Sequence, residues 1–148
     1  MTAREGVRTW VFSVRARSDA VVASSQARRL AREWGLGAKR SMELAIVVSE
    51  LATNIVKHGI QGELSLSLHP AASPRPEITV VAHDAGPPIR DLELAMTDGY
   101  DDQGPIDPSL LLRRGGLGTG LGAIARLADR VEYRQEADGK AITARFFL

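Results

Sequence analysis

The sequence predicts an α/β sandwich, in which helices cover one face of a mixed, mainly antiparallel sheet. Three observations lead to this prediction. The segments expected to be strands alternate apolar and polar residues, so each has one face to bury. Two long helical patterns follow the first of these strands, and the order of elements shows neither a repeat nor a linker. The 148 residues suffice for one hydrophobic core, so we expect residues 1–148 to form a single domain.

The first part of the chain predicts one strand followed by two helices. In TWVFSVRAR, residues 9–17, apolar residues alternate with polar ones, which is typical of a strand. A helix is predicted over 18–34, with Ser18 or Asp19 as its cap. A longer helix is predicted over 38–58, and we expect the glycine directly after it to act as its C-terminal stop.

The second part predicts four more strands around an irregular centre. Alternation places these strands at residues 63–69, 77–83, 130–135 and 141–148. A short helix is expected over 91–97. The irregular segment that follows, 98–118, is long, and such segments tend to be lids or binding loops. A helix over 121–129 then leads into the last two strands, which we expect to turn at Asp138-Gly139.

Composition narrows the class of protein. With 44% hydrophobic and 25% charged residues, the chain is similar to ordinary soluble domains. A net charge of +1 gives little support to nucleic-acid or membrane binding. The absence of cysteine excludes disulfides and cysteine metal sites and fits a reducing compartment. Because there is also no apolar run near the roughly 20 residues of a membrane span and no signal-peptide pattern, we expect a cytoplasmic protein.

The stretch SELATNIVKHG, residues 49–59, places a carboxylate and a carboxamide on one face of the second helix. Glu50 and Asn54 are four residues apart, so their side chains are neighbours on a helix. The amide oxygen of Asn54 suits a hard cation such as Mg²⁺, and Glu50 can take a proton from a hydroxyl or a water. His58 could join this site or simply pack. On spacing alone, a solvated helix face is the alternative.

The stretch VVAHDAGPPI, residues 80–89, delivers a carboxylate at the end of a hydrophobic strand. Asp84 could accept a hydrogen bond from an exocyclic amine such as N6 of adenine, while Gly86 would let the ring approach the backbone. An ordinary transition from strand to turn also favours Asp and Gly. This motif alone therefore leaves both interpretations open.

Five glycines gather in GGLGTGLG, residues 115–122, directly before an apolar helix. Without Cβ atoms, the backbone can point several N–H groups at one anion, and the helix N-terminus adds partial positive charge. Arg113 and Arg114 lie just upstream and could add charge-assisted contacts. The stretch lacks the features of the dinucleotide loop and of the P-loop. A phosphate cradle is one interpretation, and a hinge or tight packing is the other.

In this order, the three motifs supply a metal ligand, a base reader and a phosphate cradle. That order resembles the GHKL superfamily with its Bergerat ATP-binding fold. SELATNIVKHG, AMTDGY and GLGTGLGAIARLAD are more specifically similar to the anti-sigma-factor serine/threonine kinases, and among these to the RsbT-type switch kinases. The resemblance runs from about Met42 to the C-terminus.

This resemblance implies transfer of the γ-phosphoryl group of ATP to a serine or threonine of a STAS-domain partner, an anti-anti-sigma factor or stressosome protein. Asn54 would then ligate Mg²⁺, Glu50 would act as the general base, and Asp84 would read the adenine amine beside Gly86. The phosphates would lie against the second glycine box, whose residues are Gly116, Gly118, Thr119, Gly120, Leu121 and Gly122. Phosphoryl transfer depends mainly on positioning and charge neutralisation, so few side chains suffice.

The same resemblance allows two other functions. One is a nucleotide-dependent binding switch that sequesters a sigma factor or activates a PP2C-type phosphatase. The other is an ATPase of the superfamily that is not a kinase.

Three features depart from the pattern of that family. Pro88, in DAGPP, stands where the family has a second glycine, and the segment 101–114 is longer than the RsbT-type lid. Near the last strand the family often carries a threonine that faces the adenine pocket, and in this chain Lys140 stands at that place. We therefore expect the base pocket to differ from that of the family.

Overall fold

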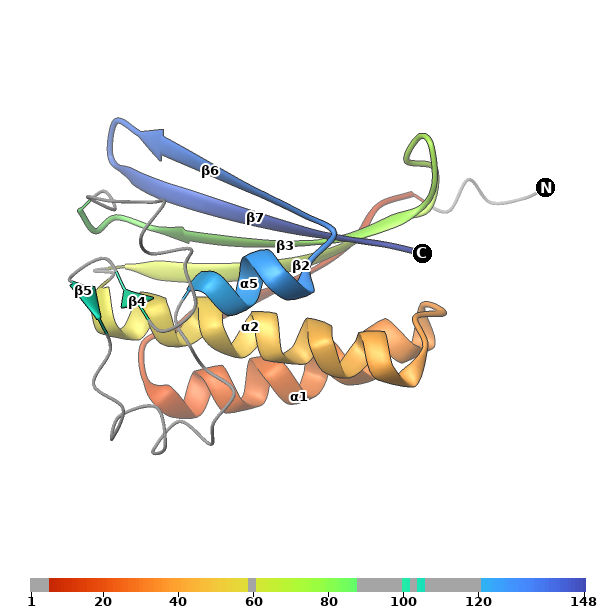
Figure 1. Ribbon diagram of the computed structural model, residues 1–148, viewed down its shortest axis with the longest axis horizontal. Coiled ribbons are helices and arrows are strands. Elements are labelled where there is room, and N and C mark those ends of the chain that lie inside the picture. The colour runs from red at the N-terminus through yellow and green to blue at the C-terminus, as the bar shows by residue number, and fades with distance from the viewer. Residues whose placement is uncertain (1–5, 59–60, 88–99, 102–103, 106–120) are drawn as a thin grey trace.

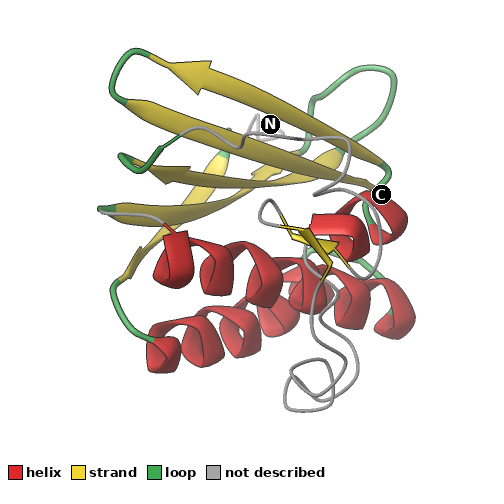
Figure 2. Ribbon diagram, turned by 60° about the vertical axis from the view of Figure 1, so that its left-hand side comes forward, coloured by secondary structure: helices red, strands yellow, loops and turns green. Residues whose placement is uncertain are grey.

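The computed structural model describes residues 6–58, 61–87, 100–101, 104–105 and 121–148. These residues form two layers, with the helices on one side of a five-stranded sheet (Figures 1 and 2). The strands are β1 (Arg8–Val14), β2 (Gly62–His69), β3 (Glu77–Asp84), β6 (Arg130–Glu136) and β7 (Gly139–Phe147). Their spatial order is β1-β2-β3-β7-β6, and all four pairings are antiparallel. The predicted α/β sandwich is confirmed.

The helical layer consists of α1 (Arg17–Glu33), α2 (Ala38–His58) and the short α5 (Leu121–Leu127). Figure 1 shows α1 and α2 running side by side beneath the sheet. The buried face of α1 is mostly alanine, which lets the two helices approach closely; its residues are Ala20, Ala23, Ala27, Leu30 and Ala31. The observed bounds of α2 are those predicted.

The core lies between α2 and the sheet. The apolar residues of α2 recur at helical spacing and are almost fully buried: Leu44, Val47, Val48, Leu51 and Ile55. Opposite them, alternate strand residues are equally buried, among them Leu64, Leu66, Ile78, Val80, Ile142, Ala144 and Phe146. In β2, β3 and β7 the buried apolar residues are alternate ones, so the alternation that predicted these strands also fixes which side chains reach the helical side.

The start of α1 differs from the prediction. Ala16 is the N-cap, so neither Ser18 nor Asp19 holds that position. The Asp19 carboxylate instead reaches back from inside the first turn and accepts the backbone N–H groups of Arg15 at 2.8 Å and Ala16 at 3.0 Å. These hydrogen bonds lower the pKa of Asp19 below its ordinary value, that with Arg15 having the larger effect.

The last hairpin also differs in detail. Glu136 pairs with Gly139, so the two turn residues are Ala137 and Asp138, and Gly139 already belongs to β7. The turn is therefore one residue earlier than the sequence suggested.

The remaining predicted elements are described only in part. Two short strands, β4 (Tyr100–Asp101) and β5 (Gly104–Pro105), pair with each other inside the segment expected to be irregular. The helix expected over 91–97, the stop at Gly59 and the rest of that segment lie outside the described residues. Among those described, no helix is long and apolar enough to cross a membrane.

Candidate functional site

Asp84 is the last residue of β3, and its side chain is buried. It continues the set of β3 residues that face the helical side, and only 3% of it is exposed. Its Oδ1 atom accepts the backbone N–H of Gly86 at 2.8 Å, which closes a tight turn directly after the strand. The predicted pair of Asp84 and Gly86 is thus held together by a direct hydrogen bond.

Lys140 lies opposite Asp84 in the pairing of β3 with β7, and it is buried as well. Its Nζ donates to Oδ1 of Asp84 at 2.8 Å and to the backbone carbonyl of Pro87 at 2.8 Å. A buried charge is costly unless an opposite charge compensates it, and here the ammonium and the carboxylate compensate each other. Lys140 therefore ties the end of β3 to the turn that follows.

Gly139 allows β7 to approach this turn. A Cβ atom at position 139 would collide with the backbone carbonyl oxygen of Asp84 and would lie 3.0 Å from Cα of Ala85. Only glycine avoids that collision. The sequence predicts Gly139 as a residue of the hairpin turn, but its contact with the turn after Asp84 follows from no local pattern, because the two segments are distant in the chain.

Glu50 and Asn54 lie one turn apart on α2, as predicted, and both are half-buried. Their position is set by the neighbouring residues Leu51 and Ile55, which turn toward the core. The two polar side chains therefore border the buried face of the central helix, which packs against β3, the strand that ends at Asp84.

The second glycine box is described only at its end. Leu121 and Gly122 begin α5, and both are buried. The other predicted phosphate contacts lie outside the described residues, namely Gly116, Gly118, Thr119, Gly120 and the two arginines Arg113 and Arg114.

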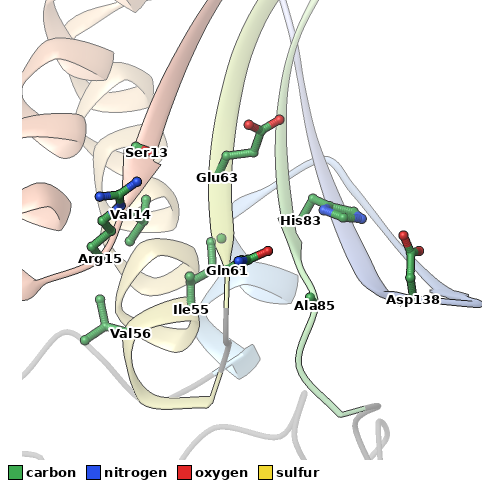
Figure 3. Close-up of a pocket in the computed structure, with 11 residues that line it drawn as sticks. Ser13, Val14, Arg15, Ile55, Val56, Gln61, Glu63, His83, Ala85 and Asp138 are labelled. Carbon is green, nitrogen blue, oxygen red and sulfur yellow. The ribbon is translucent and has the colours of Figure 1, made fainter.

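A cavity of about 540 Å³ lies at the end of the sheet where β2 begins and β3 ends (Figure 3). Figure 3 shows Ile55 and Val56, from the end of α2, on one side and Asp138, from the hairpin turn, on the other. Glu63 of β2 and His83 of β3 add polar groups to its lining. The sequence predicts Asp138 only as a residue of the hairpin turn, and it assigns no role to Glu63 or His83.

His83, Glu136 and Asp138 form a small cluster at the rim of this cavity. Nε2 of His83 lies 3.4 Å from Oε2 of Glu136, and the ligand atoms of all three lie within 4.8 Å of one another. One imidazole and two carboxylates make a donor set that suits a divalent cation. His83 and Glu136 meet across β7, where Gly139 and Ala141 offer little bulk. No spacing of residues in the sequence predicts the contact between His83 and Glu136.

Comparison with known proteins assigns the class. Residues 13–146 match the family described as the histidine kinase-like ATPase domain, so the chain belongs to that family. Serine/threonine-protein kinase RsbT from Bacillus subtilis (strain 168) is 30% identical over 127 residues, which cover 85% of this chain and 86% of that protein. The resemblance to the anti-sigma-factor kinases is thereby confirmed. Membership in an ATPase domain family implies that the chain binds ATP.

Proposed function

We propose that this chain is a serine/threonine protein kinase of the anti-sigma/switch type. It would transfer the γ-phosphoryl group of ATP to a serine or threonine of a STAS-domain partner in the cytoplasm, either an anti-anti-sigma factor or a stressosome protein. The observation that carries the proposal is the buried Asp84 at the end of β3, held by Gly86 in a tight turn, in a chain of this ATPase family.

The described residues fit a nucleotide with its metal. Asp84 offers a buried carboxylate, which suits the amine of adenine. Asn54 offers an amide oxygen on the central helix, which is a ligand type that Mg²⁺ accepts. When bound, ATP supplies the phosphoryl group and Mg²⁺ neutralises its charge.

Each residue then has a defined task. Asp84 orients the base, and Asn54 holds the metal. Glu50, one helical turn before Asn54, accepts the proton of the partner hydroxyl as that oxygen attacks the γ-phosphorus and ADP leaves. The second glycine box, which continues into α5 at Leu121, positions the phosphates.

A phosphate-transfer assay tests this function. The chain is incubated with γ-labelled ATP, Mg²⁺ and a purified STAS-domain protein from the same organism. Because a general base contributes a factor of roughly 10² to 10⁴ to the rate, Glu50→Gln should lower the labelling rate by about that factor, and Asn54→Ala should lower it as well. Glu43→Gln, which removes a carboxylate from the first part of the same helix, is the matched control and should label like wild type.

Equal labelling by wild type, Glu50→Gln and Asn54→Ala would contradict the assigned roles. If Glu50→Gln instead lost all labelling but still regulated its partner fully in cells, the chain would act as a binding switch on a sigma factor or a PP2C-type phosphatase. Rapid ATP hydrolysis with no protein acceptor would favour a non-kinase ATPase.

A further inference from the structure

Lys140 is the feature of the site that the family resemblance does not explain. It stands at the position where that family often carries a threonine. Its ammonium group contacts the carboxylate of Asp84, which is proposed to read the base. Nζ lies 2.8 Å from Oδ1 of Asp84, and only 2% of the lysine is exposed. A base that contacts Asp84 therefore also meets the charge of Lys140.

Within the described part of the chain, the hydrogen bonds of the pair leave one acceptor and one donor without a partner. Each carboxylate oxygen has about two acceptor sites, and an ammonium group has three N–H donors. Oδ1 of Asp84 accepts from Gly86 and Lys140, whereas Oδ2 accepts from none of the described residues. Nζ of Lys140 donates one N–H to Asp84 and one to the Pro87 carbonyl. Within the described part of the chain, its third N–H has no partner. Among the described residues, the pair thus keeps one acceptor, Oδ2 of Asp84, and one donor, the third N–H of Lys140.

This pattern is complementary to the edge of a 6-aminopurine. Adenine presents an amine donor at position 6 and, next to it, the ring nitrogen N1 as an acceptor. Oδ2 of Asp84 can accept from the amine while Lys140 donates to N1. Polar groups that are buried normally have hydrogen-bond partners, so a ligand that supplies both is favoured. A 6-oxopurine presents the two roles in the reverse order and would set its carbonyl oxygen against the carboxylate.

Burial of this ion pair is not by itself a strong source of stability. Replacing a buried ion pair by apolar residues of similar volume is often neutral or even stabilising. The Pro87 carbonyl, which Lys140 also holds, belongs to the turn that closes on Asp84, so the same side chain fixes the turn and points its charge at the carboxylate.

We propose that Lys140 is the donor half of a base-reading pair, in which Asp84 accepts the exocyclic amine of adenine and Lys140 donates to ring nitrogen N1. This inference rests on the proposed function, because it takes Asp84 as the residue that reads the base. It makes Lys140 a specificity-determining residue of this chain.

Nucleotide analogues test the pair in the wild-type chain. Binding of ATP, 1-deaza-ATP and 7-deaza-ATP is measured by calorimetry in the presence of Mg²⁺. The first analogue lacks N1, whereas the second keeps N1 and the amine and serves as the matched ligand control. Because a hydrogen bond to a charged donor is lost, 1-deaza-ATP should bind roughly 10- to 100-fold more weakly than ATP. 7-deaza-ATP should bind like ATP.

Two variants assign the effect to Lys140. Lys140→Met should bind ATP at least about 10-fold more weakly than wild type and should no longer distinguish ATP from 1-deaza-ATP. Arg134→Met removes one positive charge from the exposed side of the neighbouring strand and should keep the wild-type preference. Thermal unfolding of each variant checks that it is folded, and the comparison of analogues in wild type does not depend on that check.

Two results would overturn this inference alone. One is equal affinity of wild type for ATP and 1-deaza-ATP. The other is tighter binding of ATP by Lys140→Met, because Lys140 would then compete with the base for Asp84. A wild-type chain that binds none of the three nucleotides would instead overturn the proposed function, and with it this inference.

Discussion

Asp84 and Lys140 face each other across the pairing of β3 with β7, each at the end of its strand nearest the hairpin turn. Both are buried, and Nζ of Lys140 lies 2.8 Å from Oδ1 of Asp84, so each charge compensates the other. The sequence alone indicates a role for both residues: it predicts that Asp84 reads the base, and Lys140 stands where the family often carries a threonine. Their contact joins residues far apart in the chain, so no local pattern could predict it.

Asp19 provides a pH test of a single residue. The backbone N–H groups of Arg15 and Ala16 lower its pKa in the folded chain, so its contribution to stability is present above the unfolded-state pKa of about 3.9. That contribution is lost as pH falls through the lower, folded-state pKa. Asp19→Asn should therefore melt below wild type at pH 7, and the difference in Tm should shrink toward pH 2.

Thermal unfolding of both proteins across this pH range measures the difference. A gap in Tm that stays constant from pH 7 to pH 2 would contradict the role assigned to the carboxylate at the start of α1.

The sequence predicts which segments form helices and strands better than it predicts the residues at which they begin and end. Helix α2 has its predicted bounds, and its buried apolar residues recur at helical spacing from Leu44 to Ile55. The cap of α1 was misassigned, since Ser18 and Asp19 are typical caps but the Asp19 carboxylate bonds backward to Ala16. The His83–Glu136 contact was not foreseen, because it depends on which strands flank β7.

A substitution at Gly139 tests how closely β7 approaches the turn after β3. Gly139→Ala would push a methyl group into the Asp84 carbonyl oxygen, and overpacking of this kind costs about 1–3 kcal/mol. Gly6→Ala is the matched control, because Gly6 lies outside the helices and strands and a Cβ atom there meets nothing within 4 Å. Urea denaturation should show a lower free energy of unfolding for Gly139→Ala and little change for the control.

If both alanine variants were as stable as wild type, the approach of β7 to the Asp84 turn would be looser than described. ATP affinity should fall together with stability in Gly139→Ala, because the same collision displaces the proposed base reader.

The molecule as a whole sets an antiparallel sheet over a central helix, and its proposed pocket gathers groups from both. The helix contributes Glu50 and Asn54, while the sheet contributes Asp84 and Lys140 at the end of paired strands. The order of motifs in the sequence was enough to predict this class of fold, because the family resemblance rests on all three motifs together. The cavity beside His83 followed from no motif, since its lining comes from several elements that only the folded chain brings together.

Calorimetric titration of the purified chain with ATP at millimolar Mg²⁺ tests the proposed binding of Mg-ATP at Asp84. The account predicts saturable binding to wild type and much weaker binding to Asp84→Ala. It also predicts that ATP at 100 times its Kd stabilises the wild-type fold by roughly 2.7 kcal/mol. No measurable affinity of the folded wild-type chain for ATP or ADP would contradict the account.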